Sequence, residues 1–327
     1  MSWWQILLFP FAIIYDLVTR SRNWLYDIGW KKINSYSKFS IISVGNLSVG
    51  GTGKTPFVEY LIRYGLENNW RIATLSRGYG RRTKGVRIAN VADSAETLGD
   101  ESYGYFEQFG EEISVVVAEK RVEGIERIKM ELANINVILM DDAFQHRSVK
   151  PDVSFLLTTS ERPFWSDFIL PSGRLREARA GYKRADLVVI TKSQHTIGIP
   201  VDGSSATSKV SYGEQIQIAG EKKPDVLAVA GIANPADFYG YVSSNFEMIA
   251  SLSYDDHHAY QFKEIRAIVE KCLSQNAQLI TTYKDAVKLQ EFEEMNKISW
   301  GYIPIKVTFV SGEEKVLELL QSINKKC

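Results

Sequence analysis

Cysteine is nearly absent from the sequence, and this limits how the fold can be stabilised. Only Cys272 and Cys327 occur among the 327 residues. Two cysteines cannot form the disulfide framework of a small secreted domain or a four-cysteine zinc site. We therefore expect a protein of a reducing, cytosolic compartment.

An excess of charge of one sign is also missing. The 39 basic side chains balance the 39 acidic ones, so the chain lacks the general cationic field on which non-specific nucleic-acid binding relies. We expect no nucleic-acid partner, and any bound anion must be held by a local cluster of basic side chains. The contents of 45% hydrophobic and 24% charged residues are typical of a soluble globular chain of about two domains.

No apolar run is long enough for a simple transmembrane helix. The most apolar segment, Trp3–Val18, is interrupted by Pro10 and Asp16 and is shorter than the ~20 residues that span a bilayer. It also lacks the basic start and the small-residue cleavage site of a signal peptide. Aromatic and basic residues accompany it, as in helices that lie in the lipid headgroup layer: Trp3, Trp4, Tyr15, Trp24, Tyr26, Trp30, Arg20, Arg22, Lys31 and Lys32. We predict that residues 1–35 form a membrane-surface segment; the alternative is a helix buried in the core.

Short β-branched runs alternate with longer helical stretches from Phe39 onward. The runs are continuously apolar, as in parallel strands covered by helices on both faces, and lie at residues 39–46, 71–77, 113–120, 135–142, 152–159 and 185–192. The sequence predicts an α/β fold with a mostly parallel sheet. Residues 198–213 are rich in Gly, Ser and Thr and are the best linker candidate. We place a first domain at residues 36–205 and a smaller α/β domain at residues 206–327.

A glycine-rich loop lies between the first predicted strand and the next helix. Its sequence from residue 43 is SVGNLSVGGTGKTP, a variant of the phosphate-binding loop with Ser48 where glycine is usual. Backbone N–H groups at a helix N-terminus converge on phosphate oxygens, Lys54 can reach the terminal phosphates, and the Thr55 hydroxyl can bind Mg²⁺. The predicted nucleotide-binding residues are Ser48, Gly50, Gly51, Thr52, Gly53, Lys54 and Thr55.

Two aspartates end the predicted strand at residues 135–142. Asp141 and Asp142 stand where proteins with a phosphate loop place the acid that organises the metal ion. With Thr55 they form the predicted Mg²⁺ site, and the alternative is a pair of solvated carboxylates. Which of the two aspartates contacts the metal stays open.

Two further segments could supply a proton-transfer group. Asp100 and Glu101 follow Gly99, and Asp100 is either such a group or an ordinary helix N-cap. His257 and His258 are half of the four histidines of the chain. They lack the spacing to other histidines or cysteines that a zinc site needs.

Basic residues cluster in two glycine-punctuated segments. The first contains Arg77, Arg81, Arg82, Lys84 and Arg87, and the second contains Arg174, Arg176, Arg179, Lys183 and Arg184. The planar fork of arginine suits phosphate and other anions, so we expect anion recognition; the alternative is a solvated positive face.

A short polar turn follows the predicted strand at residues 185–192. Its sequence, Thr191-Lys192-Ser193-Gln194, is similar to the Thr-Lys-x-Asp element with which GTPases read guanine, but the aspartate is missing. That missing carboxylate favours ATP over GTP.

Together these motifs resemble one family, the tetraacyldisaccharide 4'-kinases, or lipid A 4'-kinases. The resemblance rests on the phosphate loop and, in the order of the family, on LSRGYGRR, GDE at 99–101, DDAFQH, LPSGRLRE, AVAGIANP, DDHHAY and TTYKDAVKL. It implies transfer of the ATP γ-phosphate to the 4'-hydroxyl of a tetraacyldisaccharide 1-phosphate, a lipid substrate. The implied location is the cytoplasmic face of the bacterial inner membrane, for a peripheral or monotopic enzyme.

The resemblance also implies roles for individual residues. It assigns Asp100 and His257 to a catalytic dyad, although the sequence leaves open whether His257 or His258 faces the site. The expected substrate-binding residues are Asn46, Arg77, Gln145, His146, Arg174 and Arg176. Two other classes remain as alternatives, a P-loop NTPase that acts on a protein partner at the membrane and a non-catalytic lipid-binding scaffold. Protein partners cannot be read from the sequence.

Overall fold

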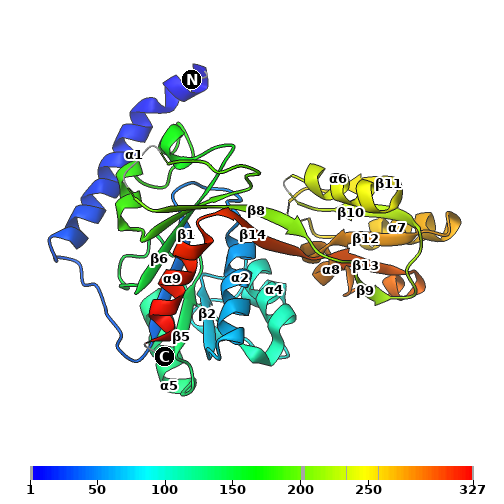
Figure 1. Ribbon diagram of the computed structural model, residues 1–327, viewed down its shortest axis with the longest axis horizontal. Helices are drawn as coiled ribbons and strands as arrows, with labels where there is room; N and C mark the ends of the chain where they lie inside the picture. Colours follow the sequence, from blue (N-terminus) through cyan, green and yellow to red (C-terminus); the bar gives the residue numbers. More distant parts are fainter. Residues whose placement is uncertain (1–2, 200–202, 233, 257, 326–327) are drawn as a thin grey trace. The chain divides into compact units, whose positions relative to one another are not determined.

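The structure is a computed structural model that describes residues 3–199, 203–232, 234–256 and 258–325. The chain divides into two units (Figure 1): the first comprises Met1–Val210 with Val307–Cys327, and the second comprises Ser211–Lys306. Each unit has its own sheet and its own hydrophobic core.

The first unit contains a sheet of nine strands within the described residues, in the order β14-β8-β7-β6-β1-β5-β2-β4-β3. Its strands are β1 (Ser40–Asn46), β2 (Ile72–Ser76), β3 (Arg87–Ile88), β4 (Ser114–Val117), β5 (Val137–Met140), β6 (Val153–Thr159), β7 (Leu187–Thr191), β8 (Ser205–Tyr212) and β14 (Ile305–Ser311). The central strand β1 is parallel to β5, with Ile42 opposite Leu139, and to β6, with Gly45 opposite Leu156. All seven residues of β1 are buried, as expected of a parallel strand covered on both faces.

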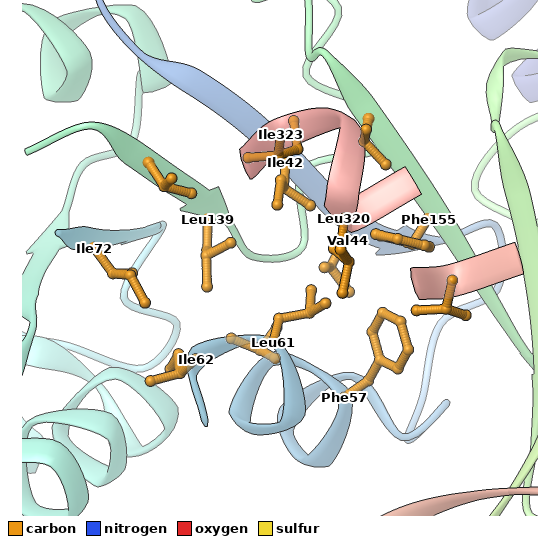
Figure 2. Close-up of a cluster of buried hydrophobic side chains, with 14 of the residues drawn as sticks. Ile42, Val44, Phe57, Leu61, Ile62, Ile72, Leu139, Phe155, Leu320 and Ile323 are labelled. Carbon is orange, nitrogen blue, oxygen red and sulfur yellow. The ribbon is translucent and has the colours of Figure 1, made fainter. Parts of the chain in front are cut away.

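Helices cover both faces of this sheet. The helices of the first unit are α1 (Trp3–Asp27), α2 (Lys54–Glu67), α3 (Ala95–Leu98), α4 (Asp100–Phe109), α5 (Arg121–Glu131) and α9 (Glu313–Asn324). Side chains from α2 and α9 share one core with Ile42 and Val44 of β1 (Figure 2). Tyr105 and Phe109 of α4 belong to the same core, whereas α5 shares a second core with Ile41. Alternate residues of β1 thus point to opposite layers.

The second unit is a smaller α/β body. Its sheet has the strand order β11-β10-β12-β13-β9 in the described residues, and only β9 is antiparallel to its neighbour. Its elements are β9 (Ile216–Ala219), β10 (Asp225–Ala230), α6 (Ala236–Asn245), β11 (Glu247–Ser253), α7 (Phe262–Ser274), β12 (Gln278–Thr282), α8 (Tyr283–Leu289) and β13 (Trp300–Ile303). Short 3₁₀ helices in the two units occupy Gly110–Glu112, Phe164–Ser166, Arg179–Arg184 and Glu293–Lys297.

The predicted α/β class, with a mostly parallel sheet and a second smaller sheet, is confirmed. The boundaries differ from the predicted ones, because residues 307–327 return to the first unit. The physical reason is that β14 joins the larger sheet, while Leu320 and Ile323 of α9 are fully buried against α2 in the first core. The predicted linker at 198–213 also contains strand β8. None of the described helices combines the length and the apolarity that a membrane crossing requires.

Candidate active site

The phosphate loop joins the carboxyl end of β1 to the first turn of α2. Gly53 precedes the helix in a left-handed conformation, with φ of 77°, which glycine adopts without steric cost. The Asn46 amide donates a hydrogen bond of 2.7 Å to the Thr52 hydroxyl, and both residues are buried. This internal hydrogen bond stabilises the loop. The N–H groups of the loop lie at the start of α2, where helix geometry favours the binding of anions.

Asp142 links the phosphate loop to the second basic cluster. Its Oδ1 lies 3.4 Å from Lys54 Nζ, and Arg176 Nη1 donates to both of its oxygens at 2.8 and 2.9 Å. Burial alone would raise the pKa of Asp142, but Lys54 and Arg176 outweigh it and hold this pKa below its usual value. The structure thus brings together the predicted metal, nucleotide and substrate residues around one carboxylate.

Asp141 has the opposite electrostatic environment. It is fully buried, and its Oδ2 accepts a hydrogen bond of 3.0 Å from the Tyr105 hydroxyl. Burial and the nearby Glu101 raise the pKa of Asp141 to about 7, against the opposing effect of Lys54. A cation bound beside Asp141 would stabilise the ionised form of this carboxylate and lower its pKa.

Glu101 also lies at the candidate site, although its position after Gly99 in the sequence indicated no particular role. Its Oε1 accepts a hydrogen bond of 3.3 Å from the Thr55 hydroxyl. Within the described residues, no three His, Cys, Asp or Glu side chains are grouped closely enough to hold a metal by themselves. This suits Mg²⁺, which proteins usually bind through one or two carboxylates together with phosphate oxygens and water.

Asp100 lies at the start of α4, where a close backbone contact fixes the helix. The N-cap position belongs to Gly99, and Asp100 is the first helical residue, so the reading of Asp100 as an N-cap is wrong. Gly99 has φ of 85°, and a Cβ there would lie 2.5 Å from the carbonyl oxygen of Tyr79. The SRGYG loop therefore packs directly on the turn that presents Asp100 and Glu101.

A cavity of about 400 Å³ lies beside Asp142. Its walls come from α1, the carboxyl ends of β2 and β5, the start of α5 and the loop at residues 174–177, and its lining residues are Tyr15, Arg22, Tyr26, Arg77, Arg121, Asp142, Gln145, His146, Ser148 and Arg176. Four of the six predicted substrate residues, Arg77, Gln145, His146 and Arg176, share this cavity. Four guanidinium groups against one carboxylate make it suited to an anion.

Burial and neighbouring groups change the pKa values and the hydrogen bonds of the polar side chains in the cavity wall. Burial, together with the nearby Arg121, lowers the pKa of His146 to about 4, so its ring is neutral near pH 7. Burial also lowers the pKa of Arg121 to about 10, while its Nη2 donates to the Asp141 carbonyl at 3.0 Å. Gln145 donates to the fully buried Glu177 at 3.1 Å, which also pairs with Arg184 at 2.8 Å.

Sequence reasoning missed Arg121 and Glu177. Arg121 follows the end of β4, on the same edge of the sheet as Asp141, so its position after a buried strand was a usable signal. Glu177 is the last residue of the LPSGRLRE motif but follows no strand. Its contacts with Asn23 and Gln145 could not be predicted, because these residues are distant in sequence.

The two other predicted substrate residues lie elsewhere. Arg174 sits beside the phosphate loop: its carbonyl accepts from Val49 N at 2.8 Å, and its Nη1 would lie 3.6 Å from a Cβ at Gly50. Asn46 lies at the start of the phosphate loop, where its carbonyl accepts a hydrogen bond of 2.9 Å from Gln145.

Of the two histidines, His257 lies outside the described residues. In the second unit, His258 Nε2 is 3.0 Å from Glu264 Oε2, and its ring stacks on Tyr254 with centroids 4.7 Å apart. Its carbonyl accepts from Lys288 Nζ at 3.1 Å. His258 is therefore engaged in contacts within its own unit.

A phosphate loop beside strand-end carboxylates is the arrangement of nucleotide-dependent phosphotransferases, and by fold and site this chain is a P-loop kinase. The family model for tetraacyldisaccharide-1-P 4'-kinase matches residues 4–325, and the chain belongs to this family. The function expected from the sequence, ATP-dependent phosphorylation of the lipid A precursor at its 4'-hydroxyl, is thereby confirmed.

Individual relatives agree over nearly the whole length. The tetraacyldisaccharide 4'-kinase of Flavobacterium psychrophilum is 40% identical, and the match covers 96% of this chain and 95% of the relative. That of Bacteroides thetaiotaomicron is 35% identical, with 94% and 90% covered. The crystal structure of LpxK from Aquifex aeolicus in complex with ATP is similar with a TM-score of 0.80 and 30% identity, over 98% of this chain and 99% of that one.

The contact between the SRGYG loop and α4 generates a prediction. Gly99→Ala should lower the turnover number by about 10²-fold, because the added Cβ displaces the turn that carries Asp100 and small misplacements are costly in positioned catalysis. Gly80→Ala is the matched control, since Gly80 has φ of 82° but nothing within 4 Å of its Cβ position. The two variants are compared by phosphorylation rate and melting temperature. Equal loss of activity in both variants would mean that the close contact between Gly99 and the Tyr79 carbonyl does not position the turn of Asp100.

Proposed function

We propose that the protein carries out this reaction on a tetraacyldisaccharide 1-phosphate held in the basic cavity. The observation that supports the proposal most strongly is the position of Asp142, which lines the cavity and pairs with Lys54 of the phosphate loop. A phosphate donor on the loop and an acceptor in the cavity would then meet at one carboxylate. Positioning and charge neutralisation account for most of the catalysis in phosphoryl transfer.

The loop residues Ser48 to Thr55 would bind the phosphates of ATP, with Lys54 reaching the γ-phosphate. Thr55, Asp141 and Asp142 would hold Mg²⁺, and Glu101 would add a further oxygen ligand, because it already contacts Thr55. The donor set consists of hard oxygen atoms, which Mg²⁺ prefers. When bound, the ion neutralises negative charge on the transferring phosphate.

The acceptor would be held by its charge and its hydroxyl groups. Arg22, Arg77, Arg121 and Arg176 line the cavity and offer planar donors to the 1-phosphate. His146 is neutral near pH 7, so it would hydrogen-bond a sugar hydroxyl rather than bind by charge. Asn46 Oδ1 is buried and has no hydrogen-bond partner among the described residues, an arrangement that fits a ligand donor.

Asp100 would accept the proton of the 4'-hydroxyl, with His257 orienting or relaying it. This assignment is supported by the position of Asp100 in the turn that also carries Glu101, which contacts Thr55 of the phosphate loop.

Transfer of radiolabel from ATP to the disaccharide 1-phosphate lipid tests the function and the role of Asp100 together. Asp100→Asn should lower kcat by on the order of 10²–10⁴-fold, with KM and melting temperature almost unchanged, because a base acts in the transition state. Glu96→Gln is the control, since this nearby carboxylate is exposed and pairs with Arg82. Release of phosphate without a labelled lipid would contradict the kinase function itself. If a lower melting temperature of Asp100→Asn accounted for its loss of activity, this result would contradict the role of Asp100 as the base.

We also propose that α1 attaches the protein to the cytoplasmic face of the bacterial inner membrane. Eight apolar side chains of its first two-thirds are 44–64% exposed, which does not fit the alternative of a core helix: Ile6, Leu7, Phe9, Phe11, Ile13, Ile14, Leu17 and Val18. The Tyr15 hydroxyl donates to the Arg176 carbonyl at 3.1 Å, and Asp27 pairs with Arg147 at 2.6 Å. One helix thus carries both an exposed apolar surface and a wall of the cavity.

This arrangement has a physical advantage for a lipid substrate. A helix in the headgroup layer would keep the cavity near acyl chains that remain in the bilayer. Attachment then raises the effective concentration of the lipid without changing the chemistry.

Charge placed on the exposed face of α1 tests the attachment. Leu7→Asp with Ile14→Asp should release the protein from vesicles of phosphatidylglycerol and raise the apparent KM for vesicle-borne lipid about 10-fold, because both side chains would leave the acyl boundary. ATP affinity should not change. Met130→Asp is the control, since Met130 is 72% exposed but belongs to α5. Unchanged vesicle binding of the double variant, or its failure to fold, would contradict the surface role.

A further inference from the structure

The turn that follows β7 lies against the phosphate loop. In the sheet order, β7 is separated from β1 only by β6, so the carboxyl ends of β1 and β7 lie on the same edge. The Thr191 hydroxyl donates to the Thr52 carbonyl at 3.0 Å, and Lys192 Nζ donates to the Gly51 carbonyl at 3.3 Å. A Cβ at Gly53 would lie 3.4 Å from Thr191. The turn and the loop are therefore packed as one surface.

The conformation of the turn is unusual for its sequence. Lys192 has φ of 58°, a left-handed conformation that non-glycine residues adopt at a cost and that is retained mainly where the surroundings require it. Here it lets the ammonium group of Lys192 reach Gly51 while Gln194 stays exposed two residues further on. The four-carbon stem of Lys192 therefore lies beside the loop, where the flat face of a base can pack on it.

The chemistry of residue 194 distinguishes the purines. In Thr-Lys-x-Asp turns the carboxylate accepts hydrogen bonds from guanine, and this chain has Gln194 at that position. A carboxylate only accepts, so it suits the N–H groups of guanine and repels the lone pair of adenine N1. An amide donates and accepts at once, which matches the amino group and the ring nitrogen of adenine, as in the bidentate pairing of glutamine with adenine.

The geometry points to Thr191–Gln194 as the base-recognition end of the nucleotide site, in which Lys192 packs along the base and Gln194 selects adenine. This inference rests on the proposed function, because it assumes that the nucleotide phosphates occupy the loop at residues 48–55. It adds two residues outside the catalytic groups that determine which nucleotide is the donor.

Exchange of the amide for a carboxylate tests the inference. Gln194→Asp restores the Thr-Lys-x-Asp pattern, and it should lower the ratio of kcat/KM for ATP to that for GTP on the order of 10- to 100-fold, the discrimination of one bidentate pair. Gln194→Ala should raise KM for ATP severalfold and leave kcat nearly unchanged, since the base takes no part in the transfer. Gln321→Asp is the matched control, because Gln321 is exposed on α9. This substitution should change neither the ratio of kcat/KM for ATP to that for GTP nor KM for ATP.

Direct binding of ATP and GTP to the same variants, measured by calorimetry, separates this inference from the proposed function. A lowered ratio of ATP affinity to GTP affinity in Gln194→Asp supports the base site even where no lipid is phosphorylated. A ratio within twofold of the unsubstituted protein overturns it, whether or not the kinase assay succeeds.

Discussion

The ion pairs of Asp142 connect the elements of the site. Lys54 belongs to α2, Asp142 follows β5, and Arg176 belongs to a loop that is distant from both in sequence. Two cations close to one another would repel without the carboxylate between them. Lys54 is only 11% exposed in its side chain, so solvent screens the pairing less than it would at an open surface. The side chain of Asp142 therefore fixes the position of the phosphate loop relative to the basic cavity.

The two neighbouring aspartates show how environment separates identical groups. Asp142 is ionised because Lys54 and Arg176 outweigh its burial, whereas burial and Glu101 raise the pKa of Asp141 to about 7. Asp142 adopts φ of 47°, a left-handed conformation that turns the chain sharply after Asp141. Consecutive carboxylates therefore face different partners, Tyr105 for one and Lys54 for the other.

Local patterns predicted most of the fold and the centre of the site. The apolar runs at 39–46 and 185–192 correspond to β1 (Ser40–Asn46) and β7 (Leu187–Thr191), because a buried parallel strand needs a continuous apolar sequence. The Gly-Lys-Thr turn and the Asp-Asp pair could also be recognised in the sequence, because each follows a predicted strand. The return of α9 to the first core could not be predicted, because its apolar face would fit either sheet. The contacts of Glu177 with Asn23, Gln145 and Arg184 also depend on the tertiary structure alone.

A double-mutant cycle on Lys54 and Asp142 tests the central claim most directly. Single variants Lys54→Met and Asp142→Asn, and the double variant, are compared by kcat/KM for ATP with the lipid acceptor at saturation. If Asp142 holds Lys54 in place, each single change lowers kcat/KM by about 10²-fold or more, and the loss in the double variant is clearly smaller than the product of the two single losses, because both single losses include the broken pair. Losses that multiply in full would mean that the pair between Lys54 and Asp142 contributes nothing, and would contradict the account.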